Sequence, residues 1–473
     1  MRRDPAALTA TLHDVIVVGG GIYGAMLAFE ATRKGLHALL LERDDFGGAT
    51  SWNSLRIAHG GLRYLQTLDL RRYHESVAER RWLLAHFPEL VRPLPCLMPL
   101  YNEGARRTSI LGVALAVNDR LSRTRNAGLP ESQRLPDGEM LGSAEVRRRF
   151  GEVARQGLRG GALWYDGVIT SSSRLLMEVL RWAESGGASA QNYVECTGFL
   201  NDGGKVAGVR ARDRHSKAVL EFRGRIVINA AGPWCRDVAA LAGSAPTSLF
   251  RPSLAFNVLL DREPLAASAL AVRPRRNGGR VYFMYPRQGR VLAGTFHAPW
   301  TGAADHPRPT EEHVTSFLTD LNDAVPDWNL RRDEVIRVLT GLLPAARDGS
   351  TALAVRDVFH DHGAHGGLKG LYSVSGVKYT TARLVAERAL NRILGGPRRD
   401  VELARPAPVS PPDIDTMVRL AHTGRQSASD LVDRLSRSEA VLNPDDLLLR
   451  RTDWGLDPRR IPELRALLPN LGA

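Results

Sequence analysis

The feature that most constrains the fold is a glycine motif, Gly19-x-Gly21-x-x-Gly24, which lies between two apolar segments near the start of the chain. Residues 15–18 read Val-Ile-Val-Val, which is typical of a short strand buried in a parallel sheet. Good helix formers follow the glycines, and a second apolar run occupies residues 38–41. This order of strand, glycine turn, helix and strand predicts a βαβ unit of the kind that binds dinucleotides.

Each glycine of the motif has a physical role in binding a dinucleotide. Gly19 permits a tight turn, Gly21 lets the backbone approach a pyrophosphate, and Gly24 lets the helix pack closely on the sheet. The helix N-terminus offers free N–H groups and positive partial charge to the phosphates. Glu42, at the end of the second apolar run, can accept a hydrogen bond from a ribose hydroxyl. The motif alone does not choose between NAD and FAD, but its N-terminal place in a long chain favours FAD.

The charge of the chain favours an anionic ligand. The formal net charge is +13 and the isoelectric point is about 10.1. The arginines are scattered along the chain, which also fits a solvated basic surface without one partner. A nucleic-acid-binding protein is a further reading, but the sequence has no recognised module or basic stripe for it. Cys96, Cys196 and Cys235 are too few and too far apart for a disulfide framework or a zinc site, so we expect a reducing compartment and no metal.

Four further segments carry a family resemblance. They read His-Gly-Gly-Leu-Arg-Tyr-Leu at 59–65, Asn-Ala-Ala-Gly-Pro-Trp at 229–234, Gly-Val-Lys-Tyr-Thr-Thr at 376–381, and Asp-Asp-Leu-Leu-Leu-Arg-Arg-Thr at 445–452. Together with the glycine motif they resemble the FAD-dependent glycerol-3-phosphate dehydrogenases, within the D-amino-acid-oxidase-like group. The resemblance covers roughly residues 13–400, with a further match at 445–452. The first of the four strings is its most specific part.

The resemblance implies an α/β fold with three parts. These are a Rossmann-type FAD-binding domain, a mostly antiparallel α+β substrate or cap domain, and a small helical C-terminal tail domain. The expected boundaries are 13–90, 151–245 and 340–400 for the FAD-binding domain, 91–150 and 246–339 for the cap domain, 401–412 for a proline-rich linker, and 413–473 for the helical domain.

The resemblance also implies a reaction and a set of site residues. A carbon that bears a hydroxyl is oxidised, hydride passes to the flavin, and a base takes the hydroxyl proton. The implied cofactor residues are Gly19, Gly21, Gly24, Glu42, Ser51, Ala231, Gly232, Trp234, Gly376, Lys378, Tyr379 and Thr380. The implied catalytic residues are His59, Arg63, Lys378 and Arg356. The implied substrate residues are Arg63, Tyr64, Arg56 and His297.

Each candidate also has a plainer interpretation. The fork of Arg63 suits a phosphate or carboxylate, but most arginines form surface ion pairs. Lys378 precedes a helix, where a cation is electrostatically unfavourable without a ligand. His59 suits a base that titrates near neutrality, or a ring packed under the flavin. Tyr64 fits packing better than catalysis, and the evidence for Arg356 is evenly balanced.

Several departures from the family concern the substrate. Leu343 stands where close relatives carry an arginine that meets substrate phosphate, and Asn257 stands where they carry a histidine. His297 replaces an aspartate, Arg56 replaces a lysine, and serines replace an Asp-Asp pair before Arg174. Arg56 and His297 are the candidates to compensate for the missing cation. The sequence therefore predicts the FAD site more firmly than the substrate.

Two enzymatic readings remain open at this level. The first is a dehydrogenase that passes electrons to quinone, with segment 104–125 at a membrane surface, because its apolar centre has arginines at both ends. The same segment also fits a helix buried in the cap domain. The second reading is an oxidase of another small hydroxy acid, polyol or amino acid that reduces oxygen. We expect a cytoplasmic protein, with the inner face of the membrane as an alternative location.

Overall fold

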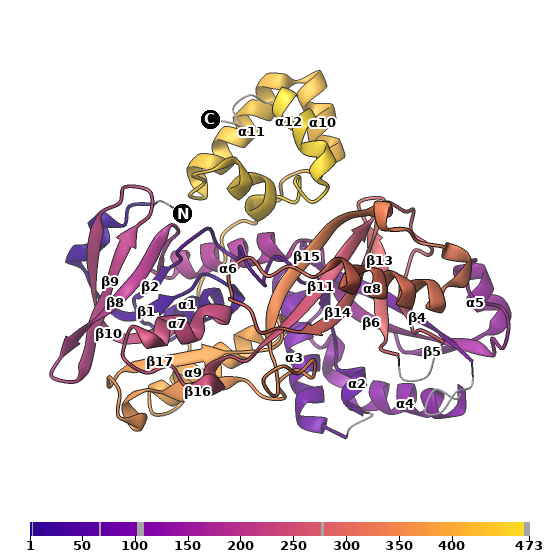
Figure 1. Ribbon diagram of the computed structural model, residues 1–473, viewed down its shortest axis with the longest axis horizontal. Helices are drawn as coiled ribbons and strands as arrows, with labels where there is room; N and C mark the ends of the chain where they lie inside the picture. The colour runs from indigo at the N-terminus through magenta and orange to yellow at the C-terminus, as the bar shows by residue number, and fades with distance from the viewer. Residues whose placement is uncertain (2, 66–67, 102–107, 276–278, 468–473) are drawn as a thin grey trace.

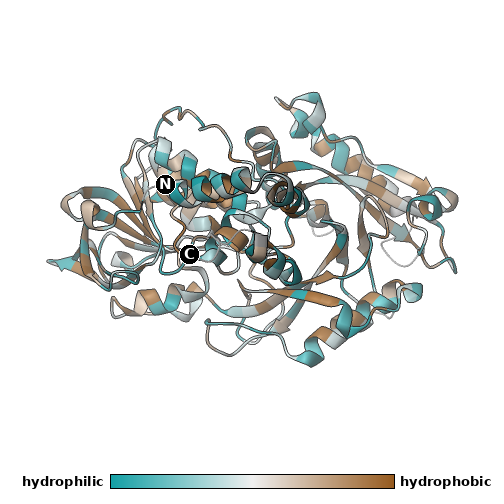
Figure 2. Cartoon of the chain, turned by 90° about the horizontal axis from the view of Figure 1, so that it is seen from above, coloured by the Kyte–Doolittle hydropathy of each residue, from teal (hydrophilic) through white to brown (hydrophobic). Residues whose placement is uncertain are grey.

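The chain forms two lobes, each built around one β-sheet, and a helical domain that lies over their junction (Figure 1). The computed structural model describes residues 1, 3–65, 68–101, 108–275 and 279–467, without the side chains at 63, 108–110, 425 and 467. The α/β fold with a helical C-terminal part is therefore confirmed. Seen from above, apolar residues concentrate on the strands and on the inner sides of the helices, and hydrophilic residues surround them (Figure 2).

The first sheet contains the predicted βαβ unit. Strand β1 (Leu12–Val18) leads through the glycine turn into helix α1 (Ile22–Arg33) and then into β2 (Ala38–Leu41), which lies parallel to β1. The sheet runs in the order β16-β17-β10-β1-β2-β7. Its other strands are β7 (Ser189–Gln191), β8 (Val194–Asp202), β9 (Lys205–Asp213), β10 (Val219–Asn229), β16 (Val358–Asp361) and β17 (Leu371–Ser375).

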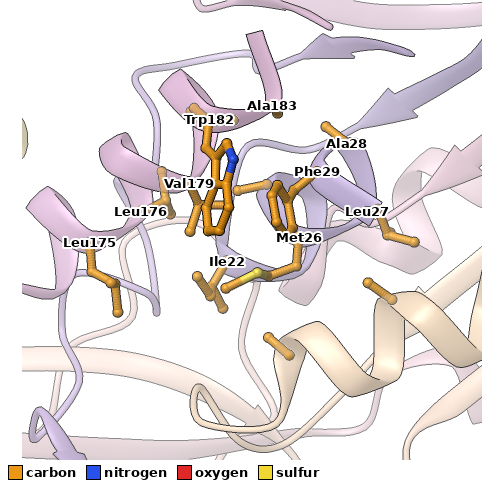
Figure 3. Close-up of a cluster of buried hydrophobic side chains, with 14 of the residues drawn as sticks. Ile22, Met26, Leu27, Ala28, Phe29, Leu175, Leu176, Val179, Trp182 and Ala183 are labelled. Carbon is orange, nitrogen blue, oxygen red and sulfur yellow. The ribbon is translucent and has the colours of Figure 1, made fainter. Parts of the chain in front are cut away.

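Helix α1 is buried because it is covered from two directions. Helices α6 (Ser172–Ser185) and α9 (Ala382–Ile393) both pack against it. In the α1–α6 contact, the rings of Phe29 and Trp182 lie 4.7 Å apart between their centroids (Figure 3). Phe29 is 1% exposed, so this contact closes the core of the first lobe. A tightly held α1 keeps the glycine turn at its N-terminus in a fixed place.

The second sheet is mostly antiparallel, as expected for a cap domain. It runs in the order β15-β11-β14-β13-β12-β4-β6-β3, with β5 beside β6. Its strands are β3 (Ile57–Ala58), β4 (Val91–Leu100), β5 (Glu139–Gly142), β6 (Gly160–Ile169), β11 (Pro252–Leu260), β12 (Ala269–Val272), β13 (Tyr282–Arg287), β14 (Arg290–Pro299) and β15 (Val335–Pro344). Helix α8 (Glu311–Ala324) covers one face through Phe317, which contacts the rings of Phe256 and Tyr282.

The sheet pairing differs from the expected domain boundaries at three strands, the first of which is β3, inside the expected segment 13–90 but paired with β6 in the second sheet. Strand β6 lies within the expected FAD-binding segment 151–245, but it pairs with β4 in the second sheet. Strand β15 crosses the expected boundary at residue 340. Strand β6 belongs to the second sheet because it pairs with β4 along its whole length, from Val91 opposite Ile169 to Leu100 opposite Gly160. Composition alone does not reveal such a pairing between strands far apart in the sequence.

The remaining helices connect and cover the two lobes. They are α2 (Leu62–Leu65), α3 (Leu70–His86), α4 (Thr108–Leu121), α5 (Ser143–Arg149) and α7 (Cys235–Ala240). Helix α4 lies in segment 104–125, of which 104–107 is outside the described residues. Its Leu111 and Leu115 are buried on the second lobe, whereas Val113 and Val117 are exposed. Among the described residues, no helix has the length and apolar character needed to cross a membrane.

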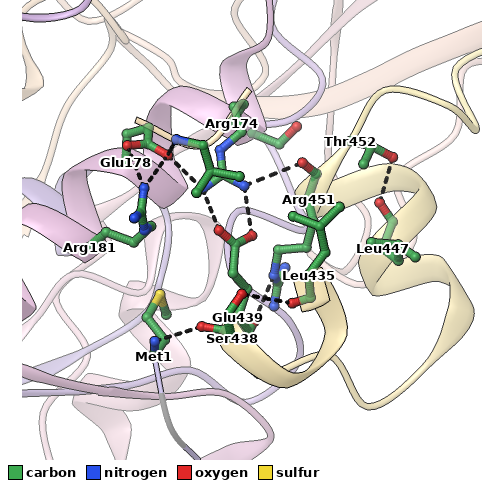
Figure 4. A network of polar contacts seen from close by, with 12 residues as sticks. Met1, Arg174, Glu178, Arg181, Leu435, Ser438, Glu439, Leu447, Arg451 and Thr452 are labelled. Carbon is green, nitrogen blue, oxygen red and sulfur yellow. Dashed lines mark hydrogen bonds and ion pairs between the residues drawn. The ribbon is translucent and has the colours of Figure 1, made fainter. Parts of the chain in front are cut away.

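The helical C-terminal domain is joined to the first lobe by buried ion pairs. Its helices are α10 (Ile414–Thr423), α11 (Arg425–Ser438) and α12 (Ile461–Leu467), with a π-helical turn η10 (Asp446–Arg451) between α11 and α12. Arg174 of α6 donates to both carboxylate oxygens of Glu439, at 2.7 and 2.8 Å (Figure 4). Arg451 of η10 makes the same kind of two-pronged contact with Asp45, at 2.6 and 2.8 Å. Bidentate contacts of this kind fix the orientation of the domain as well as its position.

Candidate active site

A large cavity lies where the two lobes and the C-terminal domain meet. Its volume is about 1320 Å³. It is lined by the glycine turn at Gly19 and Gly21, by first-lobe residues 230–234, 374–377 and 379, and by β15 of the second lobe. Residues 445, 446, 449 and 450 of the C-terminal domain complete the wall. The cavity is large enough for a dinucleotide with a small second ligand beside it.

The glycine turn leaves no room for side chains. Gly19 has a φ of +109°, and a Cβ atom there would lie 2.7 Å from the carbonyl oxygen of Ala230. A Cβ atom on Gly24 would lie 1.8 Å from the carbonyl oxygen of Gly19. Because Gly19 has no Cβ atom, β1 can turn toward the cavity. Because Gly24 has none, α1 can start directly against that turn. These are the two uses that the sequence predicted for these glycines.

The N-terminus of α1 opens on the cavity. Gly21 is the N-cap residue, and the hydroxyl of Ser51 accepts a hydrogen bond from the N–H of Ile22 at 3.0 Å. Ser51 thus lies at the helix terminus, where an anion is favoured by the helix dipole and by free N–H groups. Its predicted place beside the cofactor agrees with this geometry.

Glu42 lies half-buried beside the turn and is held by two backbone groups. The N–H of Gly20 donates to one carboxylate oxygen at 2.6 Å, and the N–H of Asp44 donates to the other at 2.8 Å. Burial raises the pKa of Glu42 to about 7, although these two hydrogen bonds act in the opposite direction. The carboxylate keeps free lone pairs toward the cavity, so it can still accept a ribose hydroxyl.

We expect the affinity of the apoprotein for FAD to fall as the pH drops below about 7. A ribose hydroxyl donates to the ionised Glu42, so binding below the pKa of about 7 requires loss of a proton. The affinity should fall by up to roughly tenfold per pH unit in that range. The folding stability of the apoprotein depends on pH in the opposite direction, and it falls as the pH rises toward the pKa of about 7. Fluorescence titration of FAD at pH 6 to 8 measures the effect, and Glu42→Gln should abolish the pH dependence; a wild-type affinity that is flat with pH would contradict it.

The predicted Asn-Ala-Ala-Gly-Pro-Trp segment lines the cavity beside the glycine turn. Ala231, Gly232 and Trp234 all belong to its wall. The indole N–H of Trp234 donates to Asp305 at 2.9 Å, and the guanidinium of Arg43 lies 4.2 Å from the centroid of the Trp234 ring. These contacts hold the indole at the cavity rim.

The turn between β17 and α9 divides its side chains between two sites. A Cβ atom on Gly376 would lie 2.2 Å from the hydroxyl of Tyr23, so only glycine fits there. That hydroxyl donates to the carbonyl of Lys378 at 2.9 Å and accepts from its N–H at 3.1 Å. Tyr379 lines the cavity and donates to the carbonyl of Ser172 at 2.6 Å. Thr380 is buried behind the turn and, like Lys378, is not part of the cavity wall.

Three predicted catalytic or substrate residues lie at the His-Gly-Gly string or beside it, and none of the three is among the residues of the cavity wall. The Nζ atom of Lys378 lies 4.0 Å from the centroid of the Tyr64 ring and donates to Ser76 of α3 at 3.2 Å. His59 begins the same turn, and its ring is 43% exposed and 5.0 Å from that of Phe283. We call His59, Tyr64 and Lys378 the turn cluster. It contains a group that can accept a proton and a cation that can bind an anion.

Four other predicted residues are placed differently. The side chain of Arg63, the first candidate for substrate binding, lies outside the described part of the structure. Arg356 is exposed and His297 is half-buried, and neither is among the residues of the cavity wall. The expectation that Arg56 compensates for the missing arginine is wrong, because both terminal nitrogens of this buried side chain contact Asp453, at 2.7 and 3.0 Å.

Residues that mark the departure from the family do lie at the cavity. Leu343 and Asn257 both contribute to the wall. The side chain of Asn257 donates to the carbonyl of Asn53 at 2.8 Å and accepts from the hydroxyl of Thr295 at 2.8 Å. These two positions of the wall are thus neutral where a phosphate-binding cation was expected.

Sequence reasoning missed three further residues of the wall. The guanidiniums of Arg337 and Arg450 lie 5.4 and 4.8 Å from the centroid of the Trp52 ring. Within the described residues, the indole nitrogen of Trp52 and Nη1 of Arg450 are buried without a hydrogen-bond partner. Such orphaned donors fit a ligand rich in acceptors, as a dinucleotide is. The 445–452 string was the signal that could have pointed to Arg450.

Comparison with known proteins agrees with this geometry. A family model described as FAD dependent oxidoreductase (DAO) matches residues 14–388. The glycerol-3-phosphate dehydrogenase of Synechocystis sp. (strain ATCC 27184 / PCC 6803 / Kazusa) is 32% identical over 403 residues, which cover 82% of this chain and 71% of that protein. The alpha-glycerophosphate oxidase of Streptococcus pyogenes serotype M1 is 32% identical over 344 residues, which cover 72% of this chain and 55% of that protein. The chain thus spans about half the length of this oxidase.

Solved structures share the fold. The glycerol-3-phosphate dehydrogenase from Bacillus halodurans complexed with FAD has a TM-score of 0.71 at 21% identity, with 99% of this chain and 92% of that chain covered. The L-alpha-glycerophosphate oxidase from Mycoplasma pneumoniae with FAD bound has a TM-score of 0.58 at 16% identity, with 84% and 97% covered. The chain belongs to the FAD-dependent oxidoreductase family, and FAD is its cofactor.

Proposed function

We propose that the chain oxidises the hydroxyl-bearing carbon of a small anionic polyol, with sn-glycerol 3-phosphate as the first substrate to test. The observation that carries the proposal is the contact of Lys378 with Tyr64 of the specific His-Gly-Gly string, which begins with the partly exposed His59. The similarity to a glycerol-3-phosphate dehydrogenase and to alpha-glycerophosphate oxidases supports the same substrate class. FAD, when bound, supplies the acceptor for the hydride.

In this proposal the residues of the turn cluster divide the work. His59 takes the proton of the substrate hydroxyl, which suits an imidazole that is exposed on one side. Lys378 attracts the anionic group of the substrate as a point charge. Tyr64 holds Lys378 in place, because its ring lies 4.0 Å from the ammonium group. Arg63 remains the candidate for a second cation from the same turn.

The test is anaerobic mixing of the purified holoenzyme with sn-glycerol 3-phosphate, followed by the flavin absorbance. We expect saturable bleaching with a high half-saturation concentration, since Leu343 stands where relatives carry a cation. Leu343→Arg should lower that concentration by about tenfold or more, because an added ion pair to phosphate contributes about 1.5–3 kcal/mol. Leu343→Met is the matched control and should change little. A holoenzyme whose flavin does not bleach at any concentration would reject this substrate.

A second candidate function is the oxidation of an unphosphorylated hydroxy acid, polyol or amino acid. The neutral wall at Leu343 and Asn257 favours it, because a phosphate dianion is normally met by more than one cation. Bleaching by such a compound, and not by sn-glycerol 3-phosphate, would support this alternative. Readmitting air then tells the acceptors apart: rapid recovery with peroxide indicates an oxidase. Recovery only with quinone in anionic vesicles would support a dehydrogenase with α4 at a membrane surface.

A further inference from the structure

Asp166 and Arg80 form a buried pair directly behind His59. One carboxylate oxygen of Asp166 accepts from the N–H of Gly60 at 2.6 Å and from Nη1 of Arg80 at 2.8 Å. The other oxygen accepts from the indole N–H of Trp164 at 3.2 Å and lies 3.2 Å from Nδ1 of His59. His59 therefore rests on a carboxylate whose two oxygens both accept from other donors.

The sheet register creates this arrangement. Strand β3 pairs with β6 so that Ile57 lies opposite Val168 and Ala58 lies opposite Gly167. The next residues along the two strands are His59 and Asp166, which meet where β3 ends. Because the backbone of β6 is fixed by its long pairing with β4, the carboxylate is held by a rigid element.

The glycine after His59 is required by the same pair. A Cβ atom on Gly60 would lie 2.0 Å from Nη1 of Arg80. Arg80 also donates from Nη1 to the carbonyl of Tyr165 at 2.8 Å, so its head is anchored and cannot give way. Part of the His-Gly-Gly string is therefore explained by the space that Arg80 needs to reach Asp166.

The charge of Asp166 decides which nitrogen of the His59 ring carries the proton. Burial alone would raise the pKa of Asp166, but the hydrogen bond from His59, the charge of Arg80 and the N–H of Gly60 hold it well below its ordinary value. An ionised carboxylate only accepts hydrogen bonds. The contact between Asp166 and His59 therefore requires a proton on Nδ1, and a neutral ring then has its lone pair on Nε2.

We infer that Asp166 is a positioning residue that fixes His59 as the Nδ1–H tautomer, so that Nε2 is the atom that takes the proton of the substrate hydroxyl. This inference rests on the proposed function, in which His59 is the base. Arg80 completes the device, because it balances the charge of Asp166 and so leaves the pair neutral when the imidazole is neutral.

The first test reads the tautomer directly and needs no substrate. Two-bond ¹H–¹⁵N correlation spectra of the ¹⁵N-histidine-labelled holoenzyme should show His59 protonated on Nδ1, with His59→Gln used to assign the signals. In Asp166→Asn the amide oxygen keeps the contacts with Gly60 and Arg80, and the amide NH₂ then faces Nδ1. The proton should move to Nε2.

A matched control is Asp320→Asn. Asp320 is a buried aspartate in α8 that accepts from the hydroxyl of Tyr282 at 2.7 Å. Its replacement tests the general effect of losing a buried carboxylate, and the tautomer of His59 should stay unchanged. An unchanged tautomer in Asp166→Asn as well would overturn the inference.

The second test is a double-mutant cycle on the rate of flavin reduction under anaerobic conditions. Asp166→Asn should slow reduction by about 10²–10⁴-fold, as loss of a correctly oriented base does. In a His59→Gln background the same change should add almost nothing, because Asp166 acts through His59. Full additivity of the two effects would overturn the inference.

The two tests separate the inference from the proposed function. If sn-glycerol 3-phosphate fails to reduce the flavin, the proposed substrate is wrong, and the tautomer spectra alone decide the role of Asp166. If the tautomer changes as expected but His59→Gln reduces the flavin at the wild-type rate, the positioning contact is supported and the role of His59 as the base is wrong.

Discussion

Gly24→Ala is expected to produce a protein that loses FAD during purification. The new methyl group would lie 1.8 Å from the carbonyl oxygen of Gly19 and 3.0 Å from its carbonyl carbon. Both atoms are backbone, so only a movement of α1 away from β1 can relieve the contact. Overpacking of this kind costs about 3 kcal/mol, which corresponds to roughly a hundredfold in FAD affinity when the cost falls on the bound form.

The expected loss comes from geometry at the phosphate end of the cofactor. The N-terminus of α1 presents its N–H groups where Gly21 and Ser51 meet. A shift of the helix by a few tenths of an ångström changes the distance of every one of these donors from the pyrophosphate. The measurements are the flavin-to-protein ratio after gel filtration and a fluorescence titration of the apoprotein with FAD.

Gly198→Ala is the matched control. Gly198 lies in β8 of the same sheet, and a Cβ atom there would meet nothing within 4 Å. The control should retain FAD as the wild type does. If Gly24→Ala also retains FAD with unchanged affinity, then close packing of α1 on the turn does not determine cofactor binding, and the role predicted for this glycine is wrong.

The cofactor end of the site could be predicted because its residues act within a short stretch of chain. The strand, the glycine turn and the helix follow one another directly, and each of them formed where the pattern predicted it. Glu42 could be placed because β2 must end beside the turn in a parallel unit. The string at 229–234 could be placed because it follows a strand, β10, of the same sheet.

The substrate end could not be predicted in the same way, because its contacts join distant segments. His59 meets Asp166 through the pairing of β3 with β6, and nothing in the local pattern marks Asp166. Arg56 was expected at the substrate because its position in the motif region is cationic in relatives. Its partner, Asp453, is almost four hundred residues away in a domain with a short sequence signature. The sequence thus showed a cation at position 56, but it did not show which carboxylate pairs with it.

Asp453→Ala is expected to destabilise the protein more than any single surface change. Asp453 is 6% exposed and lies between Arg56, which is fully buried, and Arg287 of β13. Burial alone would raise the pKa of Asp453, but these two guanidiniums hold it below its ordinary value. Removing the carboxylate leaves two buried cations without a counter-charge, which costs about 3–5 kcal/mol. Urea unfolding, followed by tryptophan fluorescence, measures the loss.

The effect should also reach the cofactor, because Asp453 joins three parts of the molecule. Arg56 directly follows residues 47–55, which line the cavity. Arg287 belongs to the second sheet, and Asp453 belongs to the C-terminal domain that completes the cavity wall. We therefore expect faster release of FAD from Asp453→Ala than from the wild type. Asp415→Ala is the control, because the pair of Asp415 with Arg460 is exposed and such pairs contribute about 1 kcal/mol at most.

A triple replacement separates charge from packing. Arg56→Met, Arg287→Met and Asp453→Leu together remove all three charges and keep most of the side-chain volume. If uncompensated charge causes the loss in Asp453→Ala, the triple variant should recover most of the stability, as replacement of buried ion clusters by apolar residues generally allows. If the triple variant is as unstable as Asp453→Ala, the stability depends on the specific hydrogen bonds of Arg56, including the one to the carbonyl of Thr170 at 3.3 Å. Recovered stability with continued fast release of FAD would assign these charges to domain orientation rather than to folding.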